Sequence, residues 1–207
     1  MLKTAPSDIE NGLISNGHTP LAGVDEVGRG PLAGPVVACA VILPEGLIIE
    51  GVNDSKKVSE KKREKLAETI MESAISYAYG IIEPAEIDEI NILQATLKAM
   101  TIALEGLSIL PKYALVDGTT PPKTERGIRI ICVPQGDSSS HLIAAASILA
   151  KVKRDKIMRE LHEMHPQYKW DTNKGYGTAA HNAAIREFGL CPAHRRSFTS
   201  SFRSEMG

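Results

Sequence analysis

The sequence predicts an α/β fold built around one mixed sheet. Short apolar runs typical of buried strands occur in both halves of the chain, and longer segments with helical apolar spacing lie between them. Two strands, a helix and a third strand come first, and helices then alternate with strands. This order is typical of a sheet that has both parallel and antiparallel neighbours. A length of 207 residues fits one such domain.

The first two strands are expected at residues 21–26 and 35–43. The second reads PVVACAVIL, a continuous apolar run that is typical of a buried strand. The glycine-rich link over 27–34 is short, so we expect the two strands to pair antiparallel.

A helix, a third strand and a second helix follow. Ser59 is a candidate cap for a helix that ends at about residue 76. Residues 77–82 form the third expected strand, which Pro84 ends. Apolar residues at helical spacing over 85–107 predict the second helix.

The second half of the chain supplies two more strands and two more helices. The apolar runs at 113–116 and 128–133 both end in polar residues. A long helix is expected over 141–164, with an alanine-rich first half and a basic second half, and another over 178–188. No internal repeat or interdomain linker interrupts the pattern.

The charge is unevenly distributed, although the net charge is only −1. Residues 1–110 carry a net charge of −7, and residues 111–207 carry +6. Such asymmetry indicates an anionic partner bound by one side of the molecule. The alternative is that the helices simply carry solvated charge.

Cysteine content and the first residues indicate a cytoplasmic protein. The three cysteines form no C-x-x-C pair, so neither a disulfide framework nor a thiolate zinc site is expected. Residues 1–20 are mostly polar, lack the features of a signal or transit peptide, and are expected to form a loose tail. No apolar run approaches the roughly 20 residues that span a bilayer.

The densest chemical signal is the segment Asp25-Glu26-Val27-Gly28-Arg29-Gly30. Two adjacent carboxylates follow an apolar strand, and they can reach one site only where that strand ends or bulges. Two glycines around Arg29 leave the backbone N–H groups open to a sugar or phosphate. The alternative is a hairpin whose acidic end is solvated.

Asp117 and Asp137 also follow apolar runs. Each alone is commonly a turn residue or a helix cap. If the first, fourth and fifth strands are neighbours, both converge with Asp25 and Glu26 at one edge of the sheet. Four such carboxylates would repel one another, and two divalent cations, Mg²⁺ or Mn²⁺, would relieve that repulsion. A pair of metal ions about 3.5–4 Å apart is typical of phosphodiester cleavage.

Several polar residues are candidates for contact with a phosphate backbone. They are Lys56, Lys57, Ser138, Ser139, Ser140, Lys151, Lys153, Arg154, Lys174 and Tyr176. The basic ones could instead form a solvated face, with Asp155 pairing Arg159, and the serines could only cap a helix. Tyr176 lies between glycines, where its ring could stack on a base or sugar or simply pack partially. The histidines show no metal spacing, and we expect them to pack in the core or on the surface.

Taken together and in this order, the segments resemble ribonuclease HII, the bacterial type 2 ribonuclease H. The resemblance covers about residues 21–198. It rests on GVDEVGRGPLAGPVVACAVIL, NDSKKVSEKKRE, EIDEINILQATLKAM, LVDG, QGDSSS, AAASILAKVKRD, NKGYGT and HRRSF. The resemblance implies a ribonuclease H-like fold, a five-stranded mixed sheet flanked by helices with extra C-terminal helices. It places one catalytic domain at 21–198, between a flexible tail at 1–20 and a second tail at 199–207.

The resemblance also implies roles for individual residues. The metal-binding catalytic carboxylates would be Asp25, Glu26, Asp117 and Asp137. Gly28, Arg29 and Gly30 would form a backbone platform that senses the ribose 2′-hydroxyl, and Tyr176 would pack against the deoxyribose at an RNA–DNA junction. The family cleaves RNA in RNA/DNA hybrids and nicks 5′ of single ribonucleotides in duplex DNA, leaving 3′-hydroxyl and 5′-phosphate ends. We expect Mn²⁺ or Mg²⁺ as cofactor, no obligatory protein partner and a monomer.

Three positions depart from the family pattern. Lys153 replaces a threonine, Asn173 replaces a histidine, and Trp170 stands where phenylalanine is usual. Two alternatives remain open, a non-catalytic hybrid-binding module and another ribonuclease H-like nuclease such as a junction resolvase or ribonuclease HIII. The segment before the first strand is too short for the extra domain of ribonuclease HIII, and the last residues do not resemble a sliding-clamp peptide.

Overall fold

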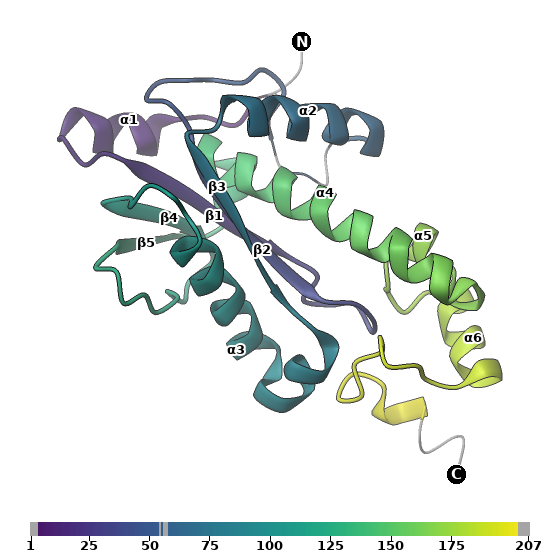
Figure 1. Cartoon of the computed structure of the whole chain (residues 1–207). Coiled ribbons are helices and arrows are strands. Elements are labelled where there is room, and N and C mark those ends of the chain that lie inside the picture. Colours follow the sequence, from purple (N-terminus) through teal and green to yellow (C-terminus); the bar gives the residue numbers. More distant parts are fainter. Residues whose placement is uncertain (1–3, 54, 56–57, 203–207) are drawn as a thin grey trace.

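The computed structural model describes residues 4–53, 55 and 58–202. Its centre is a single five-stranded sheet (Figure 1). The strands are β1 (Leu21–Val27), β2 (Val36–Ile42), β3 (Ser76–Ile82), β4 (Tyr113–Asp117) and β5 (Arg129–Val133). All five lie within two residues of the ranges expected from the apolar runs. The candidate residues Lys56 and Lys57 lie outside the described part of the chain.

The strand order is β3-β2-β1-β4-β5. β1 pairs antiparallel with β2, and β2 pairs antiparallel with β3, whereas β4 runs parallel to both β1 and β5. The sheet is therefore mixed, as the sequence predicts. Because β1, β4 and β5 are parallel neighbours, their carboxyl ends meet at one edge of the sheet.

Helices cover both faces of this sheet (Figure 1). The longer ones are α2 (Glu60–Ser73), α3 (Pro84–Glu105), α4 (His141–Met164) and α6 (Ala179–Phe188). α2 and α4 pack on one face around Cys39, Val41 and Ile148, and α3 packs on the other around Val24 and Ala99. α4 has the bounds that the sequence predicts. Its alanine-rich first half is buried on every side, as expected for a helix whose apolar residues are not confined to one face.

The helix over 84–105 is not continuous, contrary to our expectation. Asn91 has a φ of 65° and a ψ of 163° and divides α3 into two parts. Its Oδ1 accepts hydrogen bonds from the backbone N–H groups of Leu93 at 3.0 Å and Gln94 at 3.2 Å. Asparagine tolerates a positive φ and caps the second part with its side chain, so apolar spacing alone does not reveal the break.

Both expected tails contain ordered structure. Residues Asp8–Ser15 form helix α1, where we expected a loose tail, and its Glu10 is only 4% exposed. At the other end Thr199 and Phe202 are buried, with the Arg186 guanidinium 5.4 Å from the Phe202 ring centroid. Both ends are ordered because they pack against the domain. Local sequence patterns do not reveal such tertiary contacts.

The C-terminal third forms a smaller cluster beside the end of α4. It comprises the short helices η3 (Pro166–Tyr168) and α5 (Trp170–Asn173), together with α6. Tyr168 and Trp170 stack with ring centroids 4.9 Å apart, and the buried His181 and His194 pack against them. Of the two placements expected for the histidines, core or surface, His181 and His194 take the core. All three cysteines are free, and no helix among the described residues is long and apolar enough to cross a membrane.

Candidate active site

Three carboxylates meet at the carboxyl end of the parallel strands. One oxygen each of Asp25, Glu26 and Asp117 lies within 4.8 Å of the other two. Val24 pairs with Val116, so Asp25 and Asp117 follow at equivalent positions on β1 and β4. Glu26 reaches the same site because β1 ends one residue later, and its backbone N–H donates to Asp25 Oδ1 at 2.7 Å. The expected convergence of these three residues is confirmed.

The cluster carries more negative charge than its surroundings compensate. Burial raises the pKa of Asp25 well above its usual value, and the neighbouring Glu26 and Asp117 raise it further. Burial also raises the pKa of Glu26, against the opposing effect of Arg29, whose guanidinium lies 3.5 Å away. Such an all-oxygen, electron-rich donor set fits a hard divalent cation of the Mg²⁺ or Mn²⁺ type. The residues present therefore suit the metal that the sequence led us to expect.

Asp137 is not part of the cluster formed by Asp25, Glu26 and Asp117. It belongs to the 3₁₀ turn η2 (Gly136–Ser138), which follows β5. The turn is tied to the cluster because the Gly136 N–H donates to Asp117 Oδ1 at 2.7 Å. A Cβ atom on Gly136 would lie 2.4 Å from Ile143 Cδ1, so a side chain here would displace the end of Ile143. The turn that carries the fourth carboxylate is thus held at the same edge of the sheet.

The glycine platform is held from beneath by a buried arginine that sequence reasoning missed. Arg195 is fully buried and donates to the carbonyl oxygens of Gly28, Arg29 and Gly34, at 3.0 Å for Arg29. Gly28 has a φ of +96°, which favours glycine. These hydrogen bonds from the buried Arg195 side chain hold the backbone of the platform in place. The only sequence signal was the segment HRRSF, which we had noted as part of a resemblance.

Arg154 is a second buried cation in this region. We expected it on a solvated or duplex-facing surface of α4, and that prediction was wrong. Its guanidinium is fully buried and donates to the carbonyl oxygens of Pro35 at 2.9 Å, Ala33 at 3.1 Å and Lys174 at 2.9 Å. Burial lowers the pKa of Arg154 to about 10 and that of Arg195 to about 9, so both stay charged at neutral pH. Two positive charges therefore lie below the platform.

Tyr176 lies beside the platform although it comes from a distant segment. Its side chain is exposed, and a Cβ atom built on Gly30 would lie 3.6 Å from Tyr176 Cε1. Gly175 has a φ of +87° and Lys174 a φ of 52°, which gives the loop a sharp bend. The Tyr176 carbonyl lies 2.9 Å from His181 Nδ1. An exposed ring thus stands next to backbone that is open to solvent.

Four further candidates among the residues that the structure describes already have partners within the protein. Lys151 forms an ion pair with Asp155, and Lys174 Nζ lies 3.4 Å from Glu60 and donates to the Asp171 carbonyl. The hydroxyls of Ser138 and Ser139 both donate to the Gln135 carbonyl, at 2.9 and 3.2 Å. The alternative pairing of Asp155 with Arg159 was wrong, because Arg159 pairs instead with Glu60 and Glu64.

Comparisons with known proteins decide the family. The profile of the family described as Ribonuclease HII matches residues 22–201. This chain belongs to the ribonuclease HII family. It is 54% identical over 189 residues to ribonuclease HII of Caldanaerobacter subterraneus, covering 91% of this chain and 78% of that one.

Solved structures agree with this assignment. The ribonuclease H2 of Pyrococcus horikoshii superposes with a TM-score of 0.72 at 27% identity, covering 88% of this chain and 98% of that one. The ribonuclease HII of Archaeoglobus fulgidus, solved in complex with PCNA, gives a TM-score of 0.71 at 27% identity and covers 86% and 94%. The expected ribonuclease H-like fold and the identification as a type 2 ribonuclease H are confirmed.

The three departures from the usual ribonuclease HII pattern have structural roles here. Asn173 organises the Tyr176 loop, since its Nδ2 donates to the Tyr168 carbonyl and its Oδ1 accepts from the Gly175 N–H. Trp170 is fully buried. Lys153 Nζ lies 5.9 Å from the centroid of the Tyr79 ring, a cation–π distance.

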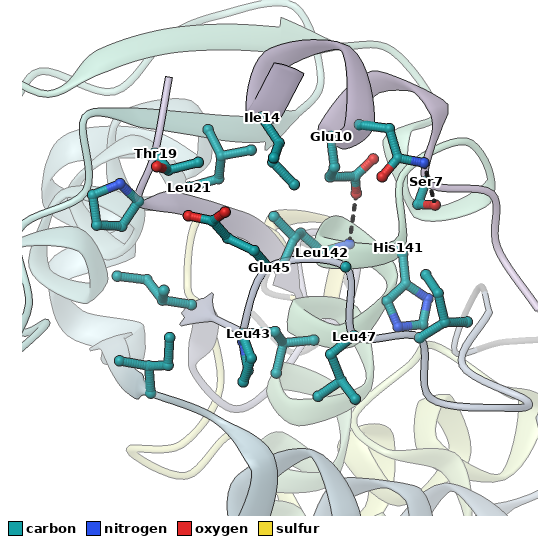
Figure 2. Close-up of a pocket in the computed structure, with 17 residues that line it drawn as sticks. Ser7, Glu10, Ile14, Thr19, Leu21, Leu43, Glu45, Leu47, His141 and Leu142 are labelled. Atoms are coloured by element: carbon teal, nitrogen blue, oxygen red, sulfur yellow. Dashed lines mark hydrogen bonds between the residues drawn. The ribbon is translucent and has the colours of Figure 1, made fainter. Parts of the chain in front are cut away.

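Two hollows differ in their relation to the carboxylates. One, of about 180 Å³, is lined by Glu26, Arg29 and Asp117 together with Thr96 and Met100 of α3. The other, of about 120 Å³, lies beneath α1 and has mainly aliphatic walls (Figure 2). None of the three clustered carboxylates lines the second hollow. Of these two hollows, only the first borders the carboxylate cluster.

Proposed function

We propose that this ribonuclease H, besides hydrolysing the RNA strand of RNA/DNA hybrids, nicks duplex DNA on the 5′ side of a single embedded ribonucleotide. The products would carry 3′-hydroxyl and 5′-phosphate ends. The observation that carries the proposal is the position of the Asp25–Glu26–Asp117 cluster at the end of the strand that leads directly into the Gly28–Gly30 platform. Scissile phosphate and ribose are adjacent in a nucleic acid, and so are these two features.

Asp25, Glu26 and Asp117, joined by Asp137, would hold two divalent cations, Mg²⁺ or Mn²⁺. When bound, such ions neutralise the developing charge and lower the pKa of the attacking water. The chain itself supplies the rigid edge of the sheet that fixes the carboxylates. The Gly136–Asp117 hydrogen bond keeps the Asp137 turn in place, and Arg29 limits the repulsion around Glu26.

Substrate selection would depend on the platform and the tyrosine. Backbone N–H groups of Gly28, Arg29 and Gly30 would meet the ribose 2′-hydroxyl, while Arg195 holds the carbonyl side of the same peptides. The Tyr176 ring would pack against the following deoxyribose and leave no room for a second 2′-hydroxyl. Together they would recognise a junction from RNA to DNA.

Polar groups around the site would hold the phosphate backbone. The candidates are Lys56, Lys57, Ser138, Ser139, Lys151 and Lys174. Lys151 and Lys174 would have to exchange their partners Asp155 and Glu60 for phosphate. We keep a cytoplasmic location and a monomer without an obligatory partner as predictions. The PCNA complex belongs to the archaeal relative.

A substrate panel tests the proposal. Purified protein is incubated with a continuous RNA/DNA hybrid, a DNA duplex containing one ribonucleotide, and a four-way DNA junction, each with Mg²⁺, Mn²⁺ or a chelator. We expect metal-dependent cleavage of the first two only. Cleavage of the hybrid without the single-ribonucleotide duplex would favour a ribonuclease HIII-like activity, and preference for the junction would indicate a resolvase. Binding without cleavage of any substrate would favour the hybrid-binding module.

A further inference from the structure

Helix α1 reaches the start of α4 through one buried carboxylate. Glu10 is 4% exposed, and its Oε1 accepts a hydrogen bond from the Ser140 hydroxyl at 2.6 Å. The same oxygen accepts from the Leu142 N–H at 2.9 Å (Figure 2). Ser140 is the N-cap of α4 and accepts from the Ile143 N–H at 3.2 Å. A residue 130 positions earlier in the chain thus caps this helix and places negative charge at the positive end of its dipole.

The capped segment is continuous with the turn that carries Asp137. The Ser140 N–H donates to the Gly136 carbonyl at 2.8 Å, and the Ser139 N–H donates to the same oxygen at 3.0 Å. At its other side the turn is fixed by the bond from the Gly136 N–H to Asp117. Asp137 therefore lies between two anchors, Asp117 in the carboxylate cluster and Glu10 in α1.

Glu10 makes this connection through hydrogen bonds more than through close packing. The hollow of about 120 Å³ lies between α1, the end of β2 and the start of α4, and Glu10, Leu21, Leu43 and Leu142 line it (Figure 2). Side chains do not fill this space. Loss of the Glu10 carboxylate would therefore leave the first turn of α4 without its polar link to α1.

We propose that Glu10 is a positioning residue that fixes the Asp137 turn relative to the carboxylate cluster through Ser140 and Leu142. The inference rests on the proposed role of Asp137 as a metal ligand. It makes the N-terminal helix part of the catalytic architecture. The Ser140 hydroxyl, which we had considered as a phosphate contact, instead serves this link.

Mn²⁺ binding to the substrate-free protein, followed by electron paramagnetic resonance of the free ion, tests the proposal. For Glu10→Ala we expect the Kd for Mn²⁺ to rise about tenfold, at the lower end of what loss of an outer partner costs a metal site. Glu10→Gln keeps an oxygen that accepts from the same two donors, so its Kd should stay within about threefold of wild type. Asp8→Asn, an exposed change on the same helix, should have no effect.

Kinetics separate positioning from simple stabilisation. In Glu10→Ala the metal concentration for half-maximal cleavage should rise while KM for the nucleic acid stays unchanged. Wild-type Mn²⁺ affinity in Glu10→Ala, with only a lower Tm, would overturn the inference. If that variant does not fold, Ser140→Ala decides, because it removes one donor from the same link and should weaken Mn²⁺ binding in the same direction; unchanged binding would overturn the inference.

Asp137→Asn distinguishes this inference from the proposed function. If Asp137→Asn binds Mn²⁺ weakly and Glu10→Ala binds it normally, only the role of Glu10 is wrong. If Asp137→Asn binds Mn²⁺ as the wild type does, the proposed ligand role of Asp137 is wrong, and the inference falls with it.

Discussion

Asp25 and Asp117 stand side by side at the ends of two parallel strands, because Val24 of β1 pairs with Val116 of β4. The pairing brings the buried Asp25 together with the half-buried Asp117, with Glu26 beside them. Such an arrangement costs free energy without a cation, as the raised pKa values of Asp25 and Glu26 indicate. The cluster is therefore a place where function is favoured over stability.

Asp25→Asn should abolish cleavage while substrate binding stays largely intact. The substitution removes one anionic oxygen from the cluster but keeps the shape of the side chain. We expect activity below about 1% of wild type at saturating metal, because a lost ligand costs at least as much as a lost outer partner. Single-turnover cleavage and a binding titration on the same duplex check this. Retained turnover would contradict the role of Asp25.

The same variant should be more stable than wild type when metal is absent. Burial and neighbouring carboxylates raise the pKa of Asp25, so its protonated form stabilises the fold at low pH, and this stabilisation is lost as the pH rises through the raised pKa. Asparagine keeps it at every pH. We expect Tm at pH 8 to rise by about 3–6 °C, with the difference shrinking on acidification. Asp8→Asn serves as the exposed control, and an equal Tm for Asp25→Asn and wild type at pH 8 would contradict the argument.

Arg195→Lys should impair cleavage although it conserves the charge. Arg195 reaches the carbonyls of Gly28, Arg29 and Gly34 from three separate nitrogens, and the single nitrogen of lysine does not reproduce this planar fork, so the platform loses its fixed orientation. We expect kcat/KM on the single-ribonucleotide duplex to fall about 10- to 100-fold, since misplacement of about 1 Å can cost a hundredfold. Arg196→Lys, an exposed neighbour, is the matched control. Equal rates in both variants would mean that the platform does not need Arg195.

Tyr176→Ala should reduce nicking at a lone ribonucleotide more than cleavage of a continuous hybrid. The exposed ring lies beside Gly30, where it can contact the sugar after the ribonucleotide. Loss of stacking costs about 1–3 kcal/mol per contact, or roughly 5- to 150-fold in rate at the junction. Tyr176→Phe should retain the preference because the ring remains. Equal losses on both substrates in Tyr176→Ala would rule out a role at the junction.

Acid should destabilise the C-terminal cluster through His194. Burial, and then His181 with its Nε2 3.1 Å away, lowers the pKa of His194 to about 4. An unfolded histidine has a pKa of about 6.5, so the unfolded chain binds the proton first as the pH falls from 6.5 to 4. The free energy of unfolding should drop by about 3 kcal/mol across that window.

Denaturant titrations at several pH values measure this slope. His194→Gln should flatten it, whereas His18→Gln, a change outside the C-terminal cluster, should leave it as in the wild type. An unchanged slope in His194→Gln would contradict the assignment.

The strands and most helices were predictable because the apolar pattern directly reflects burial. The convergence of Asp25, Glu26 and Asp117 was predictable for the same reason, once the three parallel strands were placed as neighbours. Helix α1 and the break at Asn91 were not, because they depend on tertiary contacts of Glu10 and on one side-chain cap.

The buried arginines show the main limit of sequence reasoning. A charged residue on a helix is usually solvated, so Arg154 was assigned to a surface. In the structure it satisfies carbonyls of a loop whose path only the complete fold defines. Arg195 does the same for the platform. Neither role leaves a periodic signal in the sequence.

The most direct test of the central claim is to map the cut in a DNA duplex that contains one ribonucleotide. The protein is incubated with end-labelled duplex and Mg²⁺ or Mn²⁺, and both product ends are identified, with Asp25→Asn as control. The account predicts one metal-dependent nick immediately 5′ of the ribonucleotide, with a 3′-hydroxyl on one product and a 5′-phosphate on the other. A nick at another position, other end groups, or no cut where the continuous hybrid is cleaved would contradict it.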